Sequence, residues 1–446
     1  MEAVEQLSHP FIEEANHEVL RRIQTARPVL VGLAPAKEVI PDMRDGLLLH
    51  GGPPLEWSEM AGPMRGAACG ALVFEGIASS LEDARDLCDR GEIVFEPCHA
   101  HSAVGPMAGI ISPSMPVYCV RNETFGNMAH ATINEGLGKT LRFGANDEEV
   151  ISRLRWMEEV LGPALTNALA KHGPIDLKNM MAAALRRGDE CHNRNKSGTA
   201  LFLKTLAPAL ARTCHDRERL ARTFEFIGGN DHFFLNLSMA ASKATMDAVK
   251  GVEGSTIVWT MAGNGVRYGI AVSWFGDRWF TAPPQPAVGK YFQGFSQEDA
   301  CPVMGDSYIS EPAGIGGFAM ASAPAITSFI GGKPADAIEY TTRMYRITLS
   351  KHPDFTVPNL DYEGTPLGID VRKVVATGIL PVVNSGIAHR EAGIGQIGAG
   401  IAYPPMACFE QAMEAIHEAV ASKGLSQGFK QEKGGKEQMG KNECES

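Results

Sequence analysis

The sequence predicts a mixed α+β protein built from more than one domain. Short apolar runs separated by glycine and proline, which are typical of strands and turns, fill the first 146 residues. Apolar residues then recur with a helical period of about 3.6 from 147 to 250, and strand-like runs return after 250. At about 100 to 200 residues per domain, 446 residues suffice for two to four domains. We therefore expect two mixed domains around a small helical domain.

The domain boundaries are placed where this texture changes. We expect an N-terminal mixed α/β domain at residues 1–146, a helical domain at 147–250 and a C-terminal mixed α+β domain with glycine-rich loops at 251–422. Residues 423–446 carry almost no large apolar side chain. Burial could not offset the entropy that such a segment loses on ordering, so it is predicted to be a disordered tail.

Five apolar runs of the N-terminal domain are read as strand-and-turn units, because glycine or proline punctuates each of them. An amphipathic helix is expected between the third and the fourth run, at residues 80–91. The runs occupy residues 27–36, 46–54, 70–78, 91–101 and 115–122.

Four stretches of the middle block repeat the helical period, and they occupy residues 147–173, 176–195, 199–214 and 216–249. The C-terminal domain then begins with strand-like runs and ends with helical patterns. Its strands are expected at residues 255–264, 266–276 and 278–283, and its helices at 335–350 and 407–421.

Charge and cysteine content limit the partners and the compartment. The chain has 41 Lys and Arg against 52 Asp and Glu, a net charge of -11, and no basic block, so nucleic acid is not an expected partner. Nine cysteines without a CxxC spacing are typical of reduced thiols. The N-terminus resembles no export signal, and the uncharged stretch Pro312–Gly332 is too polar to span a membrane. We expect a cytoplasmic protein that does not contact a membrane.

A glycine-rich segment near the C-terminus has the formal spacing GxGxxG at Gly393, Gly395 and Gly398. A dinucleotide site needs a strand directly before this motif and a helix within it, and neither is predicted here. We interpret residues 388–400 as a flexible loop whose amides approach an anion or a carbonyl oxygen. A tight glycine-rich crossover without a ligand is the alternative. The polar side chains of this region are Asn384, His389, Glu391 and Gln396.

A second cluster, residues 134–144, places Lys139 and Arg142 among closely spaced glycines. Such a segment suits a small carboxylate or phosphate, because arginine binds an anion with two parallel donors and lysine acts as a point charge. Asn134 and Glu135 would add polar contacts. The alternative is a surface turn with solvated basic side chains.

Two further clusters contain histidine. His99 and His101 follow a predicted strand and would share one of its faces, but no third zinc ligand is recognisable, so neither a metal nor a cofactor is expected. Hydrogen-bonded imidazoles at a strand end are the alternative. In the helical block, Asp189 and His192 are three residues apart and would share a helix face as orienting acid and base, or lie on a solvated face. Glu311 precedes the glycine-rich turn 314–317, which could hold an anion.

Several long phrases resemble, together and in order, the oxamate carbamoyltransferase large-subunit family. The resemblance extends from Arg27 to Ala421 and includes no firmly assigned catalytic residue. The chain's Lys- and Glu-containing tail departs from the family's usual ending. The phrases that carry the resemblance are HGGPPLEWSEMAGPMRGA, EPCHAHSAVGPMAGI, NEGLGKTLRFGA, GDECHNRN, NDHFFLNLSMA, RWFTAP, GFSQEDACPVMGDS and LPVVNSGIAHREAGIGQIGAG.

The resemblance implies a transferase of anaerobic allantoin breakdown. Its reaction would be the phosphorolysis of oxalurate to oxamate and carbamoyl phosphate, with small anionic ureides and phosphate as ligands. It also implies a multi-subunit complex with an acyl-CoA-synthetase-like subunit and a smaller third subunit, and it leaves a homodimer open. The fold expected from the family is mixed α and β domains around a small helical domain.

Carbamoyl transfer needs an anion clamp, donors to a developing oxyanion and a proton carrier. We predict that Arg142 and Lys139 form the clamp, that the amides of Gly393–Gly398 are the donors, and that His389, oriented by Glu391, moves the proton. His192, Asp189 and His99 are held in reserve. Two alternatives remain: the chain is a non-catalytic scaffold of the complex, or it is a metal-dependent amidohydrolase that uses His99 and His101.

Overall fold

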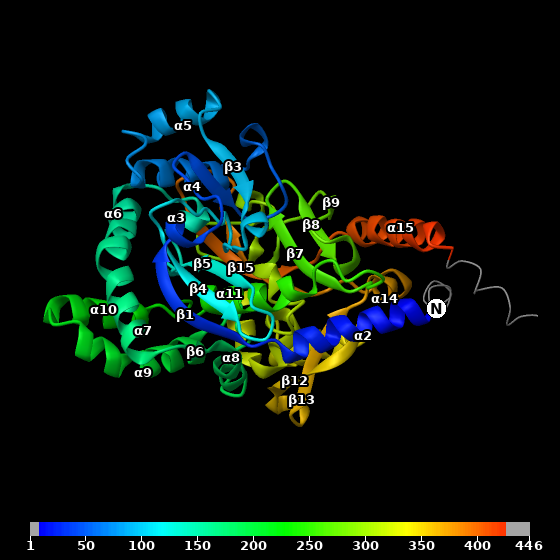
Figure 1. The fold of residues 1–446 in the computed structure, drawn as a ribbon. Coiled ribbons are helices and arrows are strands. Elements are labelled where there is room, and N and C mark those ends of the chain that lie inside the picture. Colours follow the sequence, from blue (N-terminus) through cyan, green and yellow to red (C-terminus); the bar gives the residue numbers. More distant parts are fainter. Residues whose placement is uncertain (1–8, 425–446) are drawn as a thin grey trace, which may run out of the picture.

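A buried helix, α11 (Leu235–Met246), lies in the middle of the protein, whose computed structural model describes residues 9–424 (Figure 1). Every residue of α11 is buried, so this helix has no solvent-facing side. It packs on the strands β1 (Pro28–Pro35), β4 (Pro116–Asn122) and β5 (Met128–Thr132). It also contacts the helical turn at Asp306–Ile309. The helix therefore joins segments that are remote in sequence.

The first sheet has the antiparallel order β5-β4-β1-β6, where β6 is the short strand Ile175–Asp176. Beside it, β2 (Leu47–His50) pairs in parallel with β3 (Val94–Pro97). Figure 1 shows α5 (Leu81–Asp89) above β3 and α4 (Gly62–Phe74) beside it. The helix expected at 80–91 is thus confirmed as α5.

Two expectations for the N-terminal region are wrong. Most of the run 70–78 belongs to α4, because an apolar run buried on every side lacks a period that would distinguish helix from strand. The strand expected to run through residue 101 ends at Pro97, and Cys98–His101 forms a 3-10 turn. Alternation of faces does not apply within such a turn. His99 and His101 therefore do not share a strand face.

The middle block is helical, as predicted. Its helices are α6 (Glu148–Trp156), α7 (Gly162–His172), α8 (Leu177–Leu185), α9 (Lys196–Thr213), α10 (Arg217–Gly229) and α11. The expected helix at 176–195 is too long, because α8 ends at Leu185 and the chain turns through Gly188 and Cys191, which both have positive φ angles. Asp189 and His192 therefore lie on an irregular segment and share no helix face.

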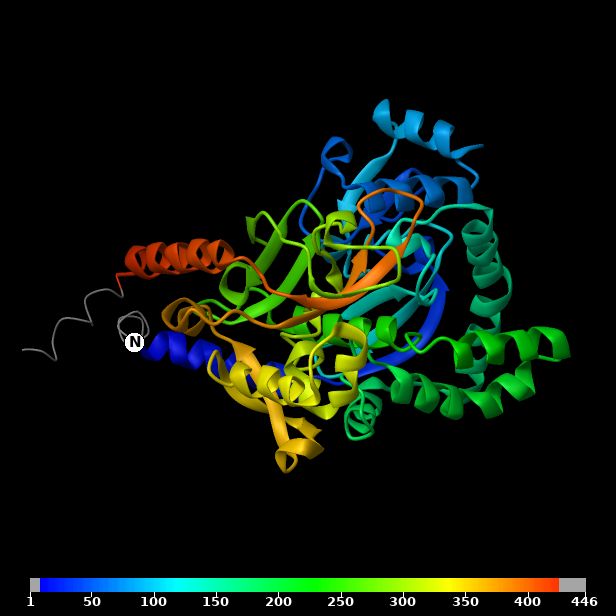
Figure 2. The same cartoon turned by 180° about the vertical axis from the view of Figure 1, so that it is seen from behind.

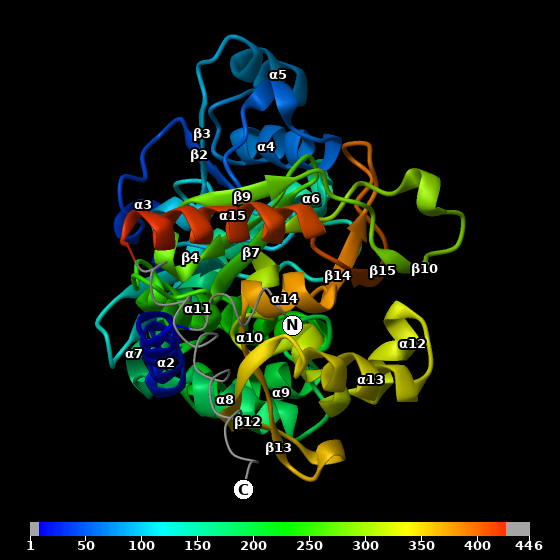
Figure 3. The ribbon, with the colours of Figure 1, turned by 90° about the vertical axis from the view of Figure 1, so that its right-hand side faces the viewer.

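The second large sheet has the antiparallel order β11-β7-β8-β9, and α15 (Met406–Ser422) packs against β8 and β9 (Figure 3). The strands expected at 255–283 and the helix at 407–421 are confirmed. The helix expected at 335–350 is shorter, because α13 (Pro334–Met344) gives way to a strand that starts at Thr348. The strands are β7 (Val258–Asn264), β8 (Tyr268–Val272), β9 (Trp279–Ala282) and β11 (Met304–Gly305).

A third sheet, β10-β15-β14, contains six of the thirteen residues, 388–400, that were expected to form a flexible loop. The strands β14 (Val383–Ala388) and β15 (Gln396–Ala402) form a hairpin, so that only residues 389–395 are loop. Figure 2 shows this orange hairpin reaching the blue N-terminal region. The approach is close, because a Cβ atom built on Gly62 would lie 2.2 Å from the carbonyl oxygen of Arg390.

The remaining elements complete the surface around these sheets, and the hairpin of β12 and β13 projects from the C-terminal region (Figure 1). They are α2 (Pro10–Thr25), α3 (Ala36–Val39), β10 (Val288–Tyr291), α12 (Thr327–Ile330), β12 (Thr348–Val357), β13 (Glu363–Ile369) and α14 (Val371–Thr377).

The division into three domains stays a prediction. At the expected boundary near residue 146, side chains from both sides share one hydrophobic core. Tyr118, Leu165 and Leu237 all belong to it. The uncharged stretch 312–332 is expected to be buried interior, and residues 312–323 are buried, whereas 324–332 are partly exposed. No helix within 9–424 is long and apolar enough to cross a membrane. The eight cysteines of that range are unpaired thiols. Apart from its first two residues, the predicted tail 423–446 lies outside the described residues.

Candidate anion-binding site

Six segments that are far apart in the sequence meet around one space, which we call the inner cavity. It measures about 280 Å³ together with the part that opens to solvent, and its lining includes Arg142, His192, His232, Ser307 and Gln396. It shares lining residues with a wider opening of about 600 Å³, which we call the outer cleft. The outer cleft is lined by Leu137, Asn193, Arg194, Asn195, Lys196, Asp231, His232, Ala325, Ile326, Ser328 and Phe329.

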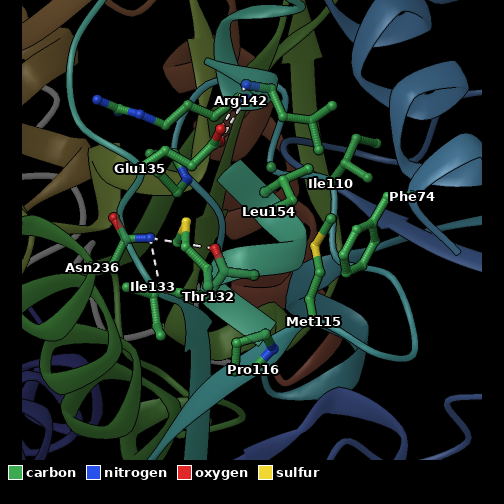
Figure 4. Close-up of a pocket in the computed structure, with 14 residues that line it drawn as sticks. Phe74, Ile110, Met115, Pro116, Thr132, Ile133, Glu135, Arg142, Leu154 and Asn236 are labelled. Atoms are coloured by element: carbon green, nitrogen blue, oxygen red, sulfur yellow. Dashed lines mark hydrogen bonds between the residues drawn. The ribbon is translucent and has the colours of Figure 1, made fainter. Parts of the chain in front are cut away.

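The segment 134–144 is closed into a loop by its own polar side chains. The Asn134 side chain accepts the Gly136 amide at 2.9 Å and donates to Asn236 Oδ1 at 2.8 Å. The Glu135 carboxylate accepts the amides of Leu141 and Arg142 at 2.9 and 3.2 Å (Figure 4). Asn134 and Glu135 therefore shape the loop that presents Arg142.

Arg142 carries a buried positive charge. Its Nε and Nη2 atoms donate to the Gly136 carbonyl at 3.2 and 2.6 Å, and its guanidinium lies over the Phe143 ring. Burial lowers the pKa of Arg142 to about 10, so the group stays charged near pH 7. No carboxylate within residues 9–424 forms a salt bridge with it. The buried Glu135 carboxylate acts on Arg142 electrostatically and raises its pKa, but it forms no salt bridge with the guanidinium. A guanidinium whose described hydrogen bonds go only to one carbonyl can still bind an anion.

On the other side of the Arg142 backbone lies a mostly apolar cavity of about 500 Å³. Figure 4 shows Phe74, Ile110, Met115 and Leu154 gathered there, while the guanidinium of Arg142 extends away from them. This placement directs the charged end of Arg142 away from the apolar side chains.

His192 lines the inner cavity and is held by a buried carboxylate. Its Nδ1 atom lies 2.9 Å from Glu311 Oε1, which also accepts the Gly317 amide at 2.9 Å. Burial alone would lower the pKa of His192, but the Glu311 carboxylate outweighs burial and raises it above the usual value. No hydrogen-bond partner within residues 9–424 contacts Nε2 of His192. The ring is thus oriented, and it has one nitrogen left for a substrate.

Two further buried groups, Glu190 and Asn384, surround His192. Glu190 accepts the His192 amide at 3.2 Å and the Asn384 side-chain amide at 3.0 Å. Burial raises the pKa of Glu190. Glu311 Oε2 and Asn384 Oδ1 have no partner among the described residues. The cluster thus holds two carboxylates beside one imidazole, an arrangement that can store and release a proton.

Asp189 does not orient His192. Its carboxylate accepts the Gly198 amide in the first turn of α9 at 2.7 Å, and its other oxygen has no hydrogen-bond partner within the described chain. Burial raises the pKa of Asp189 to about 7. The shared helix face assumed for this pair does not exist, since α8 ends before it.

The loop 389–395 supports the site from outside. His389 Nδ1 accepts the backbone amide of Glu391 at 3.0 Å, and the exposed Glu391 carboxylate makes no contact with that ring. The Gly393 amide donates to Gly144, at 2.8 Å, and therefore does not face an oxyanion. His389 is not among the residues that line the inner cavity.

The hairpin contributes one side chain to the inner cavity, Gln396. Its backbone amide donates to the Gly138 carbonyl at 3.0 Å, and its side-chain oxygen accepts the Gly138 amide at 3.1 Å. A Cβ atom on Gly395 would come within 2.9 Å of the same carbonyl, and Gly398 is part of the paired strand β15. These glycines therefore allow close packing of the hairpin on the loop 134–144.

Lys139 and His99 lie outside the cavity. Lys139 is at the surface and pairs with Asp147. His99 packs against two tryptophan rings with Nε2 3.4 Å from Asp306, and burial lowers its pKa. His101 binds Glu96 instead. Across residues 9–424, no group of three or more His, Cys, Asp or Glu side chains is placed to hold a metal ion.

Sequence reasoning missed two residues of the site. Glu311 was noted only beside a glycine-rich turn, although a single carboxylate before a 21-residue uncharged stretch is a signal of a buried, paired acid. His232, which lines both the cavity and the cleft, has no sequence signal beyond its place in NDHFF.

Comparisons with known proteins identify the family. A family model described as oxamate carbamoyltransferase subunit AllG matches residues 93–307. The chain is 48% identical over 412 residues to oxamate carbamoyltransferase subunit AllG of Escherichia coli (strain K12), covering 92% of this chain and 98% of that protein. It is also 48% identical over 402 residues to the uncharacterized protein YahG of the same strain, covering 90% and 85%.

A solved structure agrees with the fold. The crystal structure of a conserved protein of unknown function from Enterococcus faecalis V583 matches with a TM-score of 0.90 and 49% identity, covering 92% of this chain and 98% of that one. The mixed α/β fold is thereby confirmed. Because it is this similar to these relatives over most of its length, the chain belongs to the AllG family, as its sequence phrases indicate.

Proposed function

We propose that this chain is a catalytic subunit of an oxamate carbamoyltransferase-like enzyme that acts in anaerobic ureide breakdown. The observation that carries the proposal is the inner cavity, where a buried arginine and a carboxylate-held histidine meet. Family membership supports the reaction class. The uncharacterized relative YahG is as similar as AllG, so the substrate itself is part of the proposal.

The proposed reaction is the phosphorolysis of oxalurate. A phosphate oxygen attacks the terminal carbamoyl carbon, and the tetrahedral species then loses the bond between that carbon and the inner nitrogen. The proton carried by phosphate passes to the leaving nitrogen, so that carbamoyl phosphate and oxamate are formed. Such a path needs charge compensation for two anions and one group that moves a proton.

The roles follow from position in the cavity. Arg142 binds an anionic substrate group, since its buried guanidinium forms no salt bridge and its hydrogen bonds among the described residues go only to the Gly136 carbonyl. His192 carries the proton, because Glu311 fixes its Nδ1 and leaves Nε2 for the substrate. Gln396 adds a polar contact. We favour His192 over His389 as proton carrier for this reason, and we place Lys139 outside the clamp.

The expected partners are an acyl-CoA-synthetase-like subunit and a smaller third subunit. Both come from the resemblance stated above, and the description of AllG as a subunit supports a complex. A reaction that needs several subunits would leave this chain alone with little turnover.

The test measures the phosphate-dependent release of oxamate from oxalurate. It compares the complex assembled with the wild-type chain and the complex assembled with the variant Arg142→Lys. The fork of donors becomes a point charge, so kcat/KM should fall at least about tenfold, as expected for loss of a two-donor contact. Lys139→Gln is the matched control and should retain activity, since Lys139 pairs with Asp147 at the surface. Full activity of Arg142→Lys and of His192→Asn would instead support a scaffold subunit.

A further inference from the structure

Three side chains of the outer cleft each keep one buried polar atom without a hydrogen-bond partner among the described residues. The atoms are Asn193 Nδ2, Asn195 Oδ1 and His232 Nδ1. The residues are 7%, 0% and 5% exposed, so bulk water does not satisfy these atoms. Buried polar atoms without a partner are rare in folded proteins. Of the 17 such atoms among the described residues, these three belong to side chains that line one cleft, which makes this cleft the place to look for a ligand that supplies their partners.

The hydrogen-bonding character of two of these atoms is fixed by their surroundings. Asn195 Nδ2 donates to the His192 carbonyl at 2.6 Å, which leaves Oδ1 as a free acceptor. Burial, reinforced by the charges of Arg142 and His192, lowers the pKa of His232 to about 3, although the backbone of Asn193 acts to raise it. The ring is therefore neutral near pH 7. We assign its proton to Nε2, which leaves a lone pair on the buried Nδ1.

The third atom, Asn193 Nδ2, is a donor. These three atoms thus offer two acceptors and one donor, whereas the cationic side chains of the cleft, Arg194 and Lys196, are paired with Asp189 and Asp231. A carboxylate or a phosphate would face the two acceptors with its own lone pairs, so these two positions select against an anionic group. An NH₂ group next to a carbonyl oxygen offers two donors and one acceptor, which is the complementary set.

We propose that Asn193, Asn195 and His232 form a subsite that selects a primary amide or carbamoyl group, H₂N–C=O. The NH₂ group donates to Asn195 Oδ1 and His232 Nδ1, and the carbonyl oxygen accepts from Asn193 Nδ2. This assignment rests on the proposed function and adds the residues that determine its specificity. The inner cavity, which shares His232 and Asn193 with the cleft, holds the anionic end of the same ligand.

Oxamate and pyruvate test this subsite directly, because they differ only by NH₂ in place of CH₃ and carry the same charge. The dissociation constants of both are measured by calorimetry on the full-length chain, alone and with its partner subunits. We expect oxamate to bind at least about tenfold more tightly than pyruvate, since a site built for an N–H donor rejects an analogue that lacks it.

Two variants separate the donor from an acceptor. His232→Phe removes an acceptor for NH₂, so the ratio of the two dissociation constants should fall about fivefold. Asn193→Leu removes the donor to the carbonyl oxygen that both ligands possess, so both should weaken and their ratio should stay near the wild-type value. Ser197→Ala is the control and should change neither, because this α9 hydroxyl donates to the Arg187 carbonyl at 3.1 Å and lines neither the cleft nor the inner cavity.

The ratio compares two ligands on one sample, so a partly unfolded preparation does not alter it. Equal affinities in the wild type, an unchanged ratio in His232→Phe, or no oxamate binding with or without partner subunits would each overturn the subsite. Discrimination without turnover of oxalurate would overturn the proposed reaction and leave the amide subsite standing. Turnover of oxalurate without discrimination between oxamate and pyruvate would overturn the amide subsite and leave the proposed reaction standing.

Discussion

Replacing Glu311 by glutamine should lower the pKa of His192. The Glu311 carboxylate lies 2.9 Å from Nδ1 and raises that pKa against the effect of burial. An opposite charge at such a distance shifts a pKa by about 1 to 3 units, and each unit corresponds to about 1.4 kcal/mol. Glutamine keeps the shape but removes the charge. We therefore expect a fall of at least about one unit.

The sign of the effect on stability follows from the same shift. Because the folded pKa of His192 is raised, its contribution to stability is fully present below the unfolded pKa of about 6.5 and is lost as the pH rises through the folded value. In Glu311→Gln this contribution at low pH should disappear, so the variant should lose more stability at pH 5.5 than at pH 8.5. Unfolding in urea at the two pH values measures the difference.

The assay for the pKa itself is a histidine NMR titration, with the His192 signal assigned by its absence in His192→Asn. Asp189→Asn is the matched control, since Asp189 is three residues away but binds α9 and not the ring. An unchanged His192 pKa in Glu311→Gln would refute the role of Glu311. An equal shift in both variants would show that the carboxylate contact has no special effect.

Two further variants test buried groups of the same region. Burial raises the pKa of Asp189 to about 7, so the folded chain holds a proton that the unfolded chain releases, and stability should fall as the pH rises from about 4 to 7. Asp189→Asn should flatten this fall, so that Tm rises at pH 8 but not at pH 4. Equal changes of Tm at the two pH values would contradict the prediction. Gly316→Ala should abolish activity and lower stability by more than about 1 to 2 kcal/mol, because its φ is +63° and the new Cβ would lie 2.3 Å from Glu311 Oε1. Gly314→Ala is the control, because Gly314 also has a positive φ but does not lie against Glu311; it should lower stability through the backbone strain and leave Glu311 in place. Equal losses of activity in Gly314→Ala and Gly316→Ala would exclude the displacement of Glu311 as the cause.

Elements with a clear period or clear punctuation could be predicted from the sequence. The helix α5 begins at a serine cap and ends before a glycine, and β7, β8 and β9 are apolar runs separated by short turns. By contrast, the sequence pattern of residues 70–78 predicts a strand where most of these residues belong to α4. Its glycines let it approach the loop 134–144 closely, and a Cβ atom on Gly66 would lie 2.4 Å from the Gly144 carbonyl. Local periodicity carries no information about such a tertiary contact.

The candidate site likewise contains residues with a local sequence signature and residues without one. Arg142 could be predicted, because a guanidinium between closely spaced glycines has a local sequence signature. The pair of His192 and Glu311 could not, since 119 residues separate them and only the packing of the hairpin and the turn at 311–317 brings them together. The roles given to His389 and Glu391 stay predictions that the geometry favours less, because the ring accepts the Glu391 backbone amide and, among the described residues, has no hydrogen bond or ion pair with the Glu391 carboxylate.

The most direct measurement of the central claim is a crystal structure of the full chain with oxamate bound. We predict ligand density that spans the inner cavity and the outer cleft, with the carboxylate at the Arg142 guanidinium, His192 Nε2 within hydrogen-bond distance, and the amide against His232 and Asn195. Oxamate bound at another place, with the Arg142 guanidinium still attached only to the Gly136 carbonyl, would contradict it.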